Sequence, residues 1–103
     1  MAVRNLTESV TLWCAGQRLA IRCNSIHPAA VLTAMWQPML GSGPERSARV
    51  ALFVRDTPIR RFGPPEKIAV IAAVLASDKA TYLTGAELNV DGGLLAGSSA
   101  SPG

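Results

Sequence analysis

The sequence AIRCNSIHPAAVLT, from Ala20 to Thr33, decides how the rest of the chain is interpreted. Up to His27 its apolar and polar residues alternate, which is typical of a strand in a sheet. Pro28 has no N–H for a strand ladder and favours an extended conformation at the residue before it. We therefore predict a strand over Ala20–His27 that ends at Pro28. In an open α/β sheet, ligands bind beyond the carboxyl ends of the strands, so the residues after Pro28 are the first place to seek a site.

The composition indicates one small folded domain. Of the 103 residues, 49% are hydrophobic and 17% are charged, which excludes intrinsic disorder outside a tail. The net charge of +3 comes without a basic run longer than Arg60-Arg61, so no nucleic-acid partner is expected. The longest apolar run, residues 68–76, is far shorter than the ~20 residues that span a bilayer, and no signal-peptide pattern is present. We expect a soluble cytoplasmic protein without a membrane partner.

The candidate metal ligands do not form a recognised pattern. Cys14 and Cys23 fall on different predicted elements, and together with His27 they offer three ligands at a spacing that matches no closed zinc site. We expect buried, reduced thiols and no metal. The single histidine is interpreted as a structural residue with a satisfied ring, with a general base as the alternative.

Two helices are predicted from apolar periodicity. Residues Ala2–Ala15 form an amphipathic helix that Gly16 closes, with an apolar stripe of Val3, Leu6, Val10 and Trp13. A second helix starts at Pro65, where proline suits the first position and Glu66 complements the helix dipole, and it runs to about Ser77. Its apolar stripe comprises Ile68, Ile71, Ala72 and Leu75.

The mixed stretch Ala34–Thr57 lies between the strand and this second helix. A short helical turn carries Met35, Trp36, Met39 and Leu40, and Gly41 to Pro44 separates it from another helix with Val50, Leu52 and Phe53. Methionines and a tryptophan outside a sheet core suggest a pliable apolar cover over a pocket. Plain packing against the domain is an equally good interpretation.

The end of the chain predicts a second strand, Ala86–Val90, which stops at Asp91-Gly92-Gly93. Residues 97–103 are expected to form a disordered tail. Two strands joined by a long helical crossover are parallel. A parallel sheet needs several strands and cover on both faces, so two strands make an incomplete α/β domain.

Six blocks of sequence, in order, carry a resemblance to a known family. They are VRNLTESV from Val3, AIRCNSIHP from Ala20, Thr33 with Met35, RFGPPEKIA from Arg61, LASDKATYLTGAEL from Leu75 and NVDGG from Asn89. The chain resembles the C-terminal portion of a short-chain dehydrogenase/reductase, nearest to the hydroxysteroid dehydrogenase-like members. The resemblance implies an α/β fold that is the C-terminal part of a doubly wound, Rossmann-type parallel sheet. Its partial domain would span residues 1–96, with a lid at about 34–57.

This resemblance also implies an NAD(P)-dependent oxidoreductase that acts on secondary alcohols and ketones. In the family, the loop after this strand lies against the nicotinamide, where a threonine hydroxyl and the amide N–H two residues earlier meet the carboxamide. The matching cofactor-binding positions are Pro28, Ala29, Val31 and Thr33, and Ala29 replaces the usual glycine, which adds a methyl group and restricts positive φ. The substrate lid would comprise Met35, Trp36, Met39 and Leu40. Asn24 would tie the strand to a neighbouring loop.

No catalytic residue is expected in the chain. The family needs a Gly-rich cofactor loop and a Tyr-x-x-x-Lys pair. The only tyrosine of this sequence, Tyr82, has no lysine four residues later and so does not form such a pair. By alignment the catalytic lysine would lie just before Met1, so the chain is expected to begin inside the helix that carries the pair. We expect the chain alone to be inactive. The residue that separates NAD from NADP would also lie upstream, so both cofactors stay open.

Two functional hypotheses follow. In the first, the chain is the C-terminal part of a dehydrogenase and supplies the nicotinamide loop, the substrate lid and a subunit contact. In the second, it has no catalysis and acts as an interaction or assembly module. The apolar helix stripes and the unpaired strand edge predict self-association, or pairing with an N-terminal half or a full-length subunit.

Overall fold

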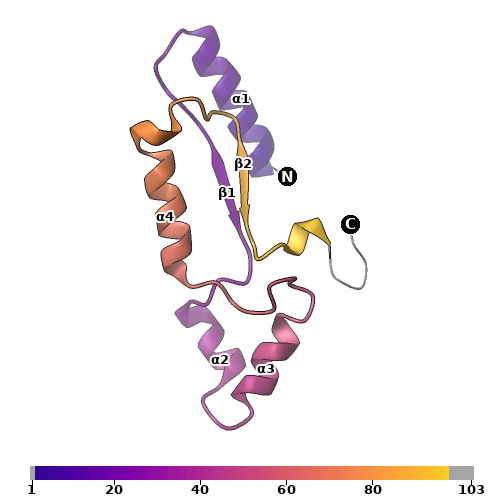
Figure 1. The fold of residues 1–103 in the computed structure, drawn as a ribbon. Coiled ribbons are helices and arrows are strands. Elements are labelled where there is room, and N and C mark those ends of the chain that lie inside the picture. Colours follow the sequence, from indigo (N-terminus) through magenta and orange to yellow (C-terminus); the bar gives the residue numbers. More distant parts are fainter. Residues whose placement is uncertain (1, 98–103) are drawn as a thin grey trace. The chain divides into compact units, whose positions relative to one another are not determined.

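The computed structural model describes residues 2–97 and combines two short strands with helices (Figure 1). The described residues divide into two compact units. The first unit contains residues 2–27 and Ala69–Leu88, and the second contains Pro28–Ile68 and residues 89–97. The predicted tail, apart from Gly97, lies outside the described residues.

Strands β1 (Ser25–Pro28) and β2 (Glu87–Val90) pair in one two-stranded sheet. The Ser25 N–H donates to the Ala86 carbonyl, and four residues later the Ala29 N–H donates to the Val90 carbonyl. An equal step along both chains means that the strands run in the same direction, as the arrows in Figure 1 show. The predicted α/β fold with parallel strands is confirmed.

The predicted start of the first strand at Ala20 is wrong. Residues 20–24 are not in a strand. Around Cys23, a side chain takes part in the pairing with the segment before β2. The Cys23 N–H donates to the Thr84 hydroxyl, at 3.1 Å, while the Cys23 carbonyl accepts from the Gly85 N–H. A regular ladder begins only at Ser25 and includes Pro28, whose missing N–H is not needed at the last position of the strand.

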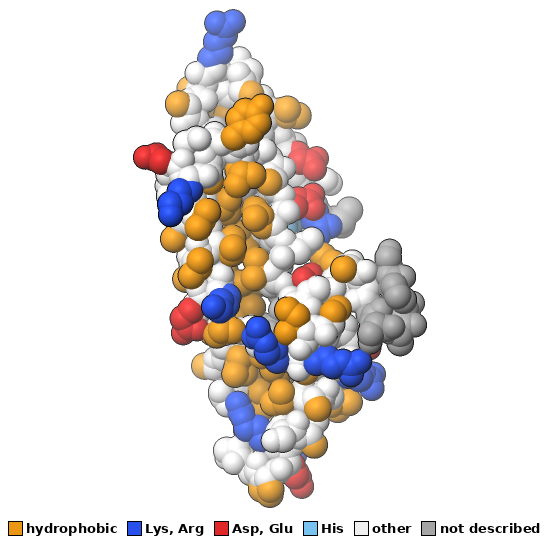
Figure 2. Space-filling model, in the orientation of Figure 1, with side chains coloured by type: hydrophobic (Ala, Val, Ile, Leu, Met, Phe, Trp, Pro, Cys, Tyr) orange, Lys and Arg blue, Asp and Glu red, His pale blue; other side chains and the backbone are white. Residues whose placement is uncertain are grey.

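Helix α1 (Ala2–Gly16) forms as predicted, and Gly16 is its last residue. Its buried residues are Thr7 and Cys14. The predicted apolar stripe is largely exposed: Val3, Leu6 and Trp13 have about 60% of their surface accessible, at 59%, 64% and 61%. The space-filling view shows many hydrophobic side chains at the molecular surface (Figure 2).

Helix α4 (Pro65–Leu75) begins at the predicted proline and ends two residues before Ser77. It stops there because Ser77 is extended and accepts the Lys79 N–H, which opens the 3₁₀ turn η2 (Asp78–Ala80). Three residues of the predicted stripe, Ile68, Ile71 and Leu75, are half-buried, whereas Ala72 is exposed.

The second unit contains a small apolar core. It lies among the 3₁₀ turn η1 (Ala34–Trp36), α2 (Gln37–Leu40) and α3 (Arg46–Phe53). Leu40, Val54 and Phe62 form its centre, and the Trp36 ring packs edge-on against Phe62 at a centroid distance of 4.9 Å. The turn η3 (Leu94–Ala96) follows β2.

Both cysteines are free thiols, Cys14 buried and Cys23 half-buried. Within residues 2–97, no three His, Cys, Asp or Glu side chains are grouped to hold a metal ion. None of the helices in this part of the chain is both long and apolar enough to cross a membrane.

Candidate functional site

The loop that follows β1 is held by Gly63. The Gly63 N–H donates to the Ala30 carbonyl and the Gly63 carbonyl accepts the Leu32 N–H, both at 2.9 Å, so Val31 and Gly63 form a parallel bridge. In such a bridge the residue between the two bonded neighbours turns its own N–H to the opposite edge. The Val31 N–H therefore points away from Gly63.

Two polar groups of this loop are available to a ligand. Among the described residues, neither the Val31 N–H nor the Thr33 hydroxyl has a hydrogen-bond partner. Thr33 is exposed and extended, and it precedes η1 without capping it through its side chain. The loop thus offers a backbone donor and a hydroxyl two residues apart.

The backbone of this loop has a positive φ at one residue that is not glycine. It is Ala30, whose φ is +53°, and not Ala29, where alanine replaces the usual glycine of the family. A positive φ in a residue with a Cβ costs about 1–2 kcal/mol and persists only where neighbouring contacts hold it. The two hydrogen bonds of Gly63, on either side of Val31, supply that restraint.

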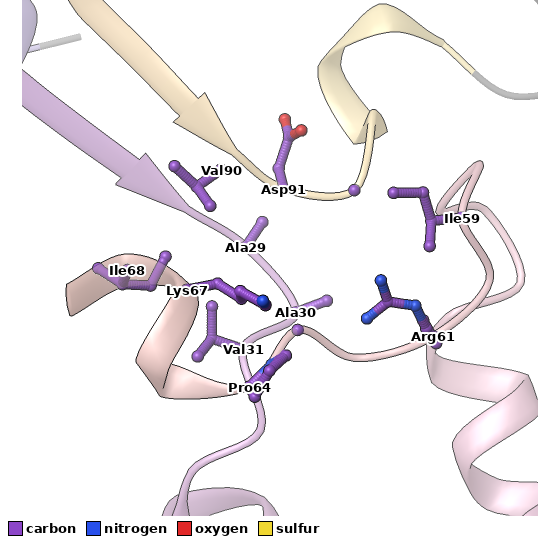
Figure 3. Close-up of a pocket in the computed structure, with 12 residues that line it drawn as sticks. Ala29, Ala30, Val31, Ile59, Arg61, Pro64, Lys67, Ile68, Val90 and Asp91 are labelled. Carbon is purple, nitrogen blue, oxygen red and sulfur yellow. The ribbon is translucent and has the colours of Figure 1, made fainter. Parts of the chain in front are cut away.

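A pocket of about 130 Å³ opens beside this loop, within the second unit (Figure 3). Its walls come from the loop after β1, the turn before α4 with the first turn of that helix, and the end of β2. The lining residues are Ala29, Ala30, Val31, Ile59, Arg61, Gly63, Pro64, Lys67, Ile68, Val90, Asp91 and Gly92. Of the predicted cofactor residues, Ala29 and Val31 line the pocket, whereas Pro28 and Thr33 do not.

The charged groups of the pocket are unequally placed. The side chains of Arg61 and Lys67 extend toward its interior, while the Asp91 carboxylate points away from it (Figure 3). Asp91 is 6% exposed, and its carboxylate oxygens accept the N–H groups of Gly93 and Leu95 at 2.9 and 3.1 Å. From the sequence, Lys67 is expected in the helix that begins at Pro65 and Arg61 shortly before it, and no site is predicted at either residue.

The four predicted lid residues divide into two pairs. Leu40 is fully buried and Trp36 packs on the same core. Met35 and Met39 are 83% and 50% exposed. None of the four lines the pocket. The packing interpretation describes Trp36 and Leu40 well, and a role as a lid stays a prediction.

Two residues on β1 or next to it have the structural contacts that we expected. The Asn24 amide nitrogen donates to the Leu83 carbonyl and its oxygen accepts the Ala86 N–H, both at 3.0 Å. Asn24 thus ties its segment to the neighbouring loop, as predicted. The His27 Nε2 lies 2.7 Å from the Ser25 hydroxyl, so the ring has a partner on its own strand.

Comparison with known proteins identifies the family. A sequence model described as enoyl-(acyl carrier protein) reductase matches residues 1–95, which is most of the chain. The chain belongs to the short-chain dehydrogenase/reductase family. The predicted resemblance is therefore confirmed.

Relatives in this short-chain dehydrogenase/reductase family include named dehydrogenases. The chain is 37% identical over 97 residues to a 3-beta-hydroxysteroid dehydrogenase of Comamonas testosteroni, covering 91% of this chain and 37% of that protein. It is 37% identical over 95 residues to an NADP-dependent (R)-specific alcohol dehydrogenase of Lentilactobacillus kefiri, covering 92% of this chain and 36% of that protein.

A solved relative shows the same fold. A C-terminal deletion mutant of Thermoplasma acidophilum aldohexose dehydrogenase superposes with a TM-score of 0.77 at 35% identity, covering 91% of this chain and 42% of that structure. The chain spans little more than a third of the length of the two sequence relatives.

Proposed function

We propose that this chain is the C-terminal part of an NAD(P)-dependent short-chain dehydrogenase/reductase that interconverts secondary alcohols and ketones. The observation that carries the proposal is the pair of unpartnered polar groups, the Val31 N–H and the Thr33 hydroxyl, in the loop beyond β1. Family membership and the names of the relatives support the reaction class.

The loop has the donor set that a nicotinamide carboxamide requires. The Val31 N–H can donate to the carboxamide oxygen, and the Thr33 hydroxyl can donate to it or accept from its nitrogen. Two hydrogen bonds at fixed positions on the loop orient the ring and so select which of its faces meets the substrate. When bound, the nicotinamide supplies or accepts the hydride. Pro28 and Ala29 form the backbone that leads from the strand to this position.

Saturation-transfer NMR with NADPH and the full chain tests the role of the loop. We expect the nicotinamide protons to receive more saturation than the adenine protons, because the chain offers contacts to the carboxamide end. Thr33→Val should weaken binding about three- to ten-fold, the usual effect of one hydrogen bond. Thr81→Val, at another exposed threonine outside the loop, is the matched control. Equal saturation of both ring systems would contradict the proposal.

The lid is a second part of this proposal. Met35 and Met39 would form its exposed, pliable surface, anchored by Trp36 and Leu40. Covers belong to the less stable parts of a protein, so residues 34–57 should exchange amide hydrogens faster than residues 20–26. Equal protection of the two segments would count against a lid.

The exposed stripe of α1 favours an assembly role as the alternative. We propose that the chain pairs with itself or with the N-terminal part of a family member through Val3, Leu6 and Trp13. Light scattering of the full chain should then give a mass above that of a monomer. Leu6→Gln should lower that mass, and Leu52→Gln, at a similarly exposed leucine on α3, should not. A monomer at micromolar concentration would exclude self-pairing.

A further inference from the structure

We propose that the pocket beside the β1 loop binds a small monoanion with an apolar portion, of the type of a short-chain carboxylic acid. The inference goes beyond the dehydrogenase function and does not depend on a nicotinamide. It is carried by the size of the pocket, by its mostly apolar wall and by two cationic side chains that extend into it (Figure 3).

The size of the pocket sets the size of the ligand. Its volume of about 130 Å³ is well below the roughly 300–1,000 Å³ of sites that hold drug-sized molecules. A dinucleotide or a steroid cannot be enclosed in it. An acid with a few carbon atoms can be.

Most of the wall is aliphatic. Its apolar members include Ala29, Val31, Ile59, Ile68 and Val90. Such a wall favours burial of an alkyl group, at about 0.8 kcal/mol for each CH₂. A bare, strongly hydrated ion gains nothing from it and loses hydration. The wall therefore selects for a ligand with a hydrocarbon part.

The charges select for an anion. No ion pair within residues 2–97 engages Arg61 or Lys67, and the only hydrogen bond of the Arg61 guanidinium is a long one, 3.4 Å, to the Phe62 carbonyl. The one acidic residue of the wall, Asp91, is already bonded by the Gly93 and Leu95 amides. A guanidinium can hold both oxygens of a carboxylate, and the ammonium adds a point charge.

The helix beside the pocket adds to this preference. Pro64, Lys67 and Ile68 place the first turn of α4 in the wall, and the N-terminal end of a helix carries a partial positive charge. Three sources of positive potential thus border one apolar space.

The test measures binding of butyrate to the full chain in the absence of any nicotinamide nucleotide. Binding is monitored through the ¹⁵N NMR shifts of the Ala30 and Gly92 amides. n-Butanol serves as the uncharged analogue and inorganic phosphate as the anion without a tail. We expect butyrate to bind in the millimolar range and about five-fold more tightly than either. Equal binding of butanol or of phosphate would overturn the proposal.

Charge variants locate the anion. Arg61→Gln and Lys67→Gln should each weaken butyrate binding by about three- to five-fold, the effect of losing one exposed ion pair. Arg55→Gln removes the same charge from an exposed arginine of the same unit that does not line the pocket, and it should change binding less than two-fold. An equal loss in Arg55→Gln would overturn the assignment. The ratio of butyrate to butanol affinity within each variant does not depend on the folded fraction, so partial unfolding cannot imitate the result.

Because no cofactor is present in this experiment, its failure leaves the dehydrogenase proposal intact. In the same way, failure of NADPH to bind leaves the anion pocket intact.

Discussion

The two units of the chain are stabilised in different ways. In the second unit, large side chains are buried: Leu40, Val54 and Phe62 pack with Trp36. In the described part of the first unit, the buried hydrophobic residues are small, Cys14 and Ala80.

The polar contacts of the first unit centre on the segment before β1. Asn24 bonds Leu83 and Ala86, the Thr84 hydroxyl accepts the Cys23 N–H, and Thr11 donates to the Cys23 carbonyl at 3.0 Å. Because hydrogen bonds to water compete with each of these, each contributes about 0.5–1.5 kcal/mol. Burial of large apolar side chains is thus concentrated in the second unit, while the first unit relies more on hydrogen bonds of side chains to the backbone.

The largest effect is expected from Leu40→Ala. Leu40 is 0% exposed, so truncation leaves a cavity and should destabilise the second unit by about 3 kcal/mol. Urea unfolding followed by Trp36 fluorescence, with Trp13→Phe as the background, reports on this unit alone. Leu52→Ala, at a leucine that is 57% exposed, is the control and should cost under about 0.5 kcal/mol. Equal losses in the two variants would show that the apolar core does not stabilise this unit.

An intermediate effect is expected from Asn24→Ala. The change leaves the Ala86 N–H without its partner and the Leu83 carbonyl with only the long bond from Arg22, at 3.4 Å, which should cost the first unit about 1–2 kcal/mol. Amide exchange at Gly85 and Ala86 should accelerate, while that of the Val54 amide in the second unit should not. Asn5→Ala, at an exposed residue of α1, should leave both unchanged. Unaltered exchange at Ala86 would show that the hydrogen bonds of Asn24 do not stabilise the first unit.

The smallest effects are expected from the ion pairs. Arg4 and Glu87 lie 2.9 Å apart with about a quarter to a third of each side chain exposed, 26% and 33%. Arg49 on α3 and Glu45 at the N-terminal cap of this helix lie 3.0 Å apart, and their side chains are 47% and 76% exposed. Glu87→Gln should cost up to about 1 kcal/mol, and Glu45→Gln no more than about 0.5 kcal/mol. Urea titrations of both variants at low and high salt measure the difference, which salt should reduce. A larger loss in Glu45→Gln would reverse the expected order.

Local patterns in the sequence determined helices α1 and α4 and the second strand. Apolar spacing in residues 2–15 and the Pro65-Glu66 start are properties of a single segment, and helices α1 and α4 follow them within two residues. The second strand was correct within one residue, Glu87–Val90 against the predicted Ala86–Val90. The role of Asn24 came from its family block and was confirmed by two hydrogen bonds.

Tertiary structure decided the features that depend on contacts between segments far apart in the sequence. The start of β1 depends on the segment before β2, because the Thr84 hydroxyl replaces a backbone partner at Cys23, and no alternation of residues encodes that. The positive φ at Ala30, rather than at Ala29, follows from the bridge to Gly63. The pocket that joins Arg61 and Lys67 to Val31 and Asp91 collects residues up to about sixty positions apart. Sequence spacing cannot place such residues together, because only the packed chain brings their side chains within reach.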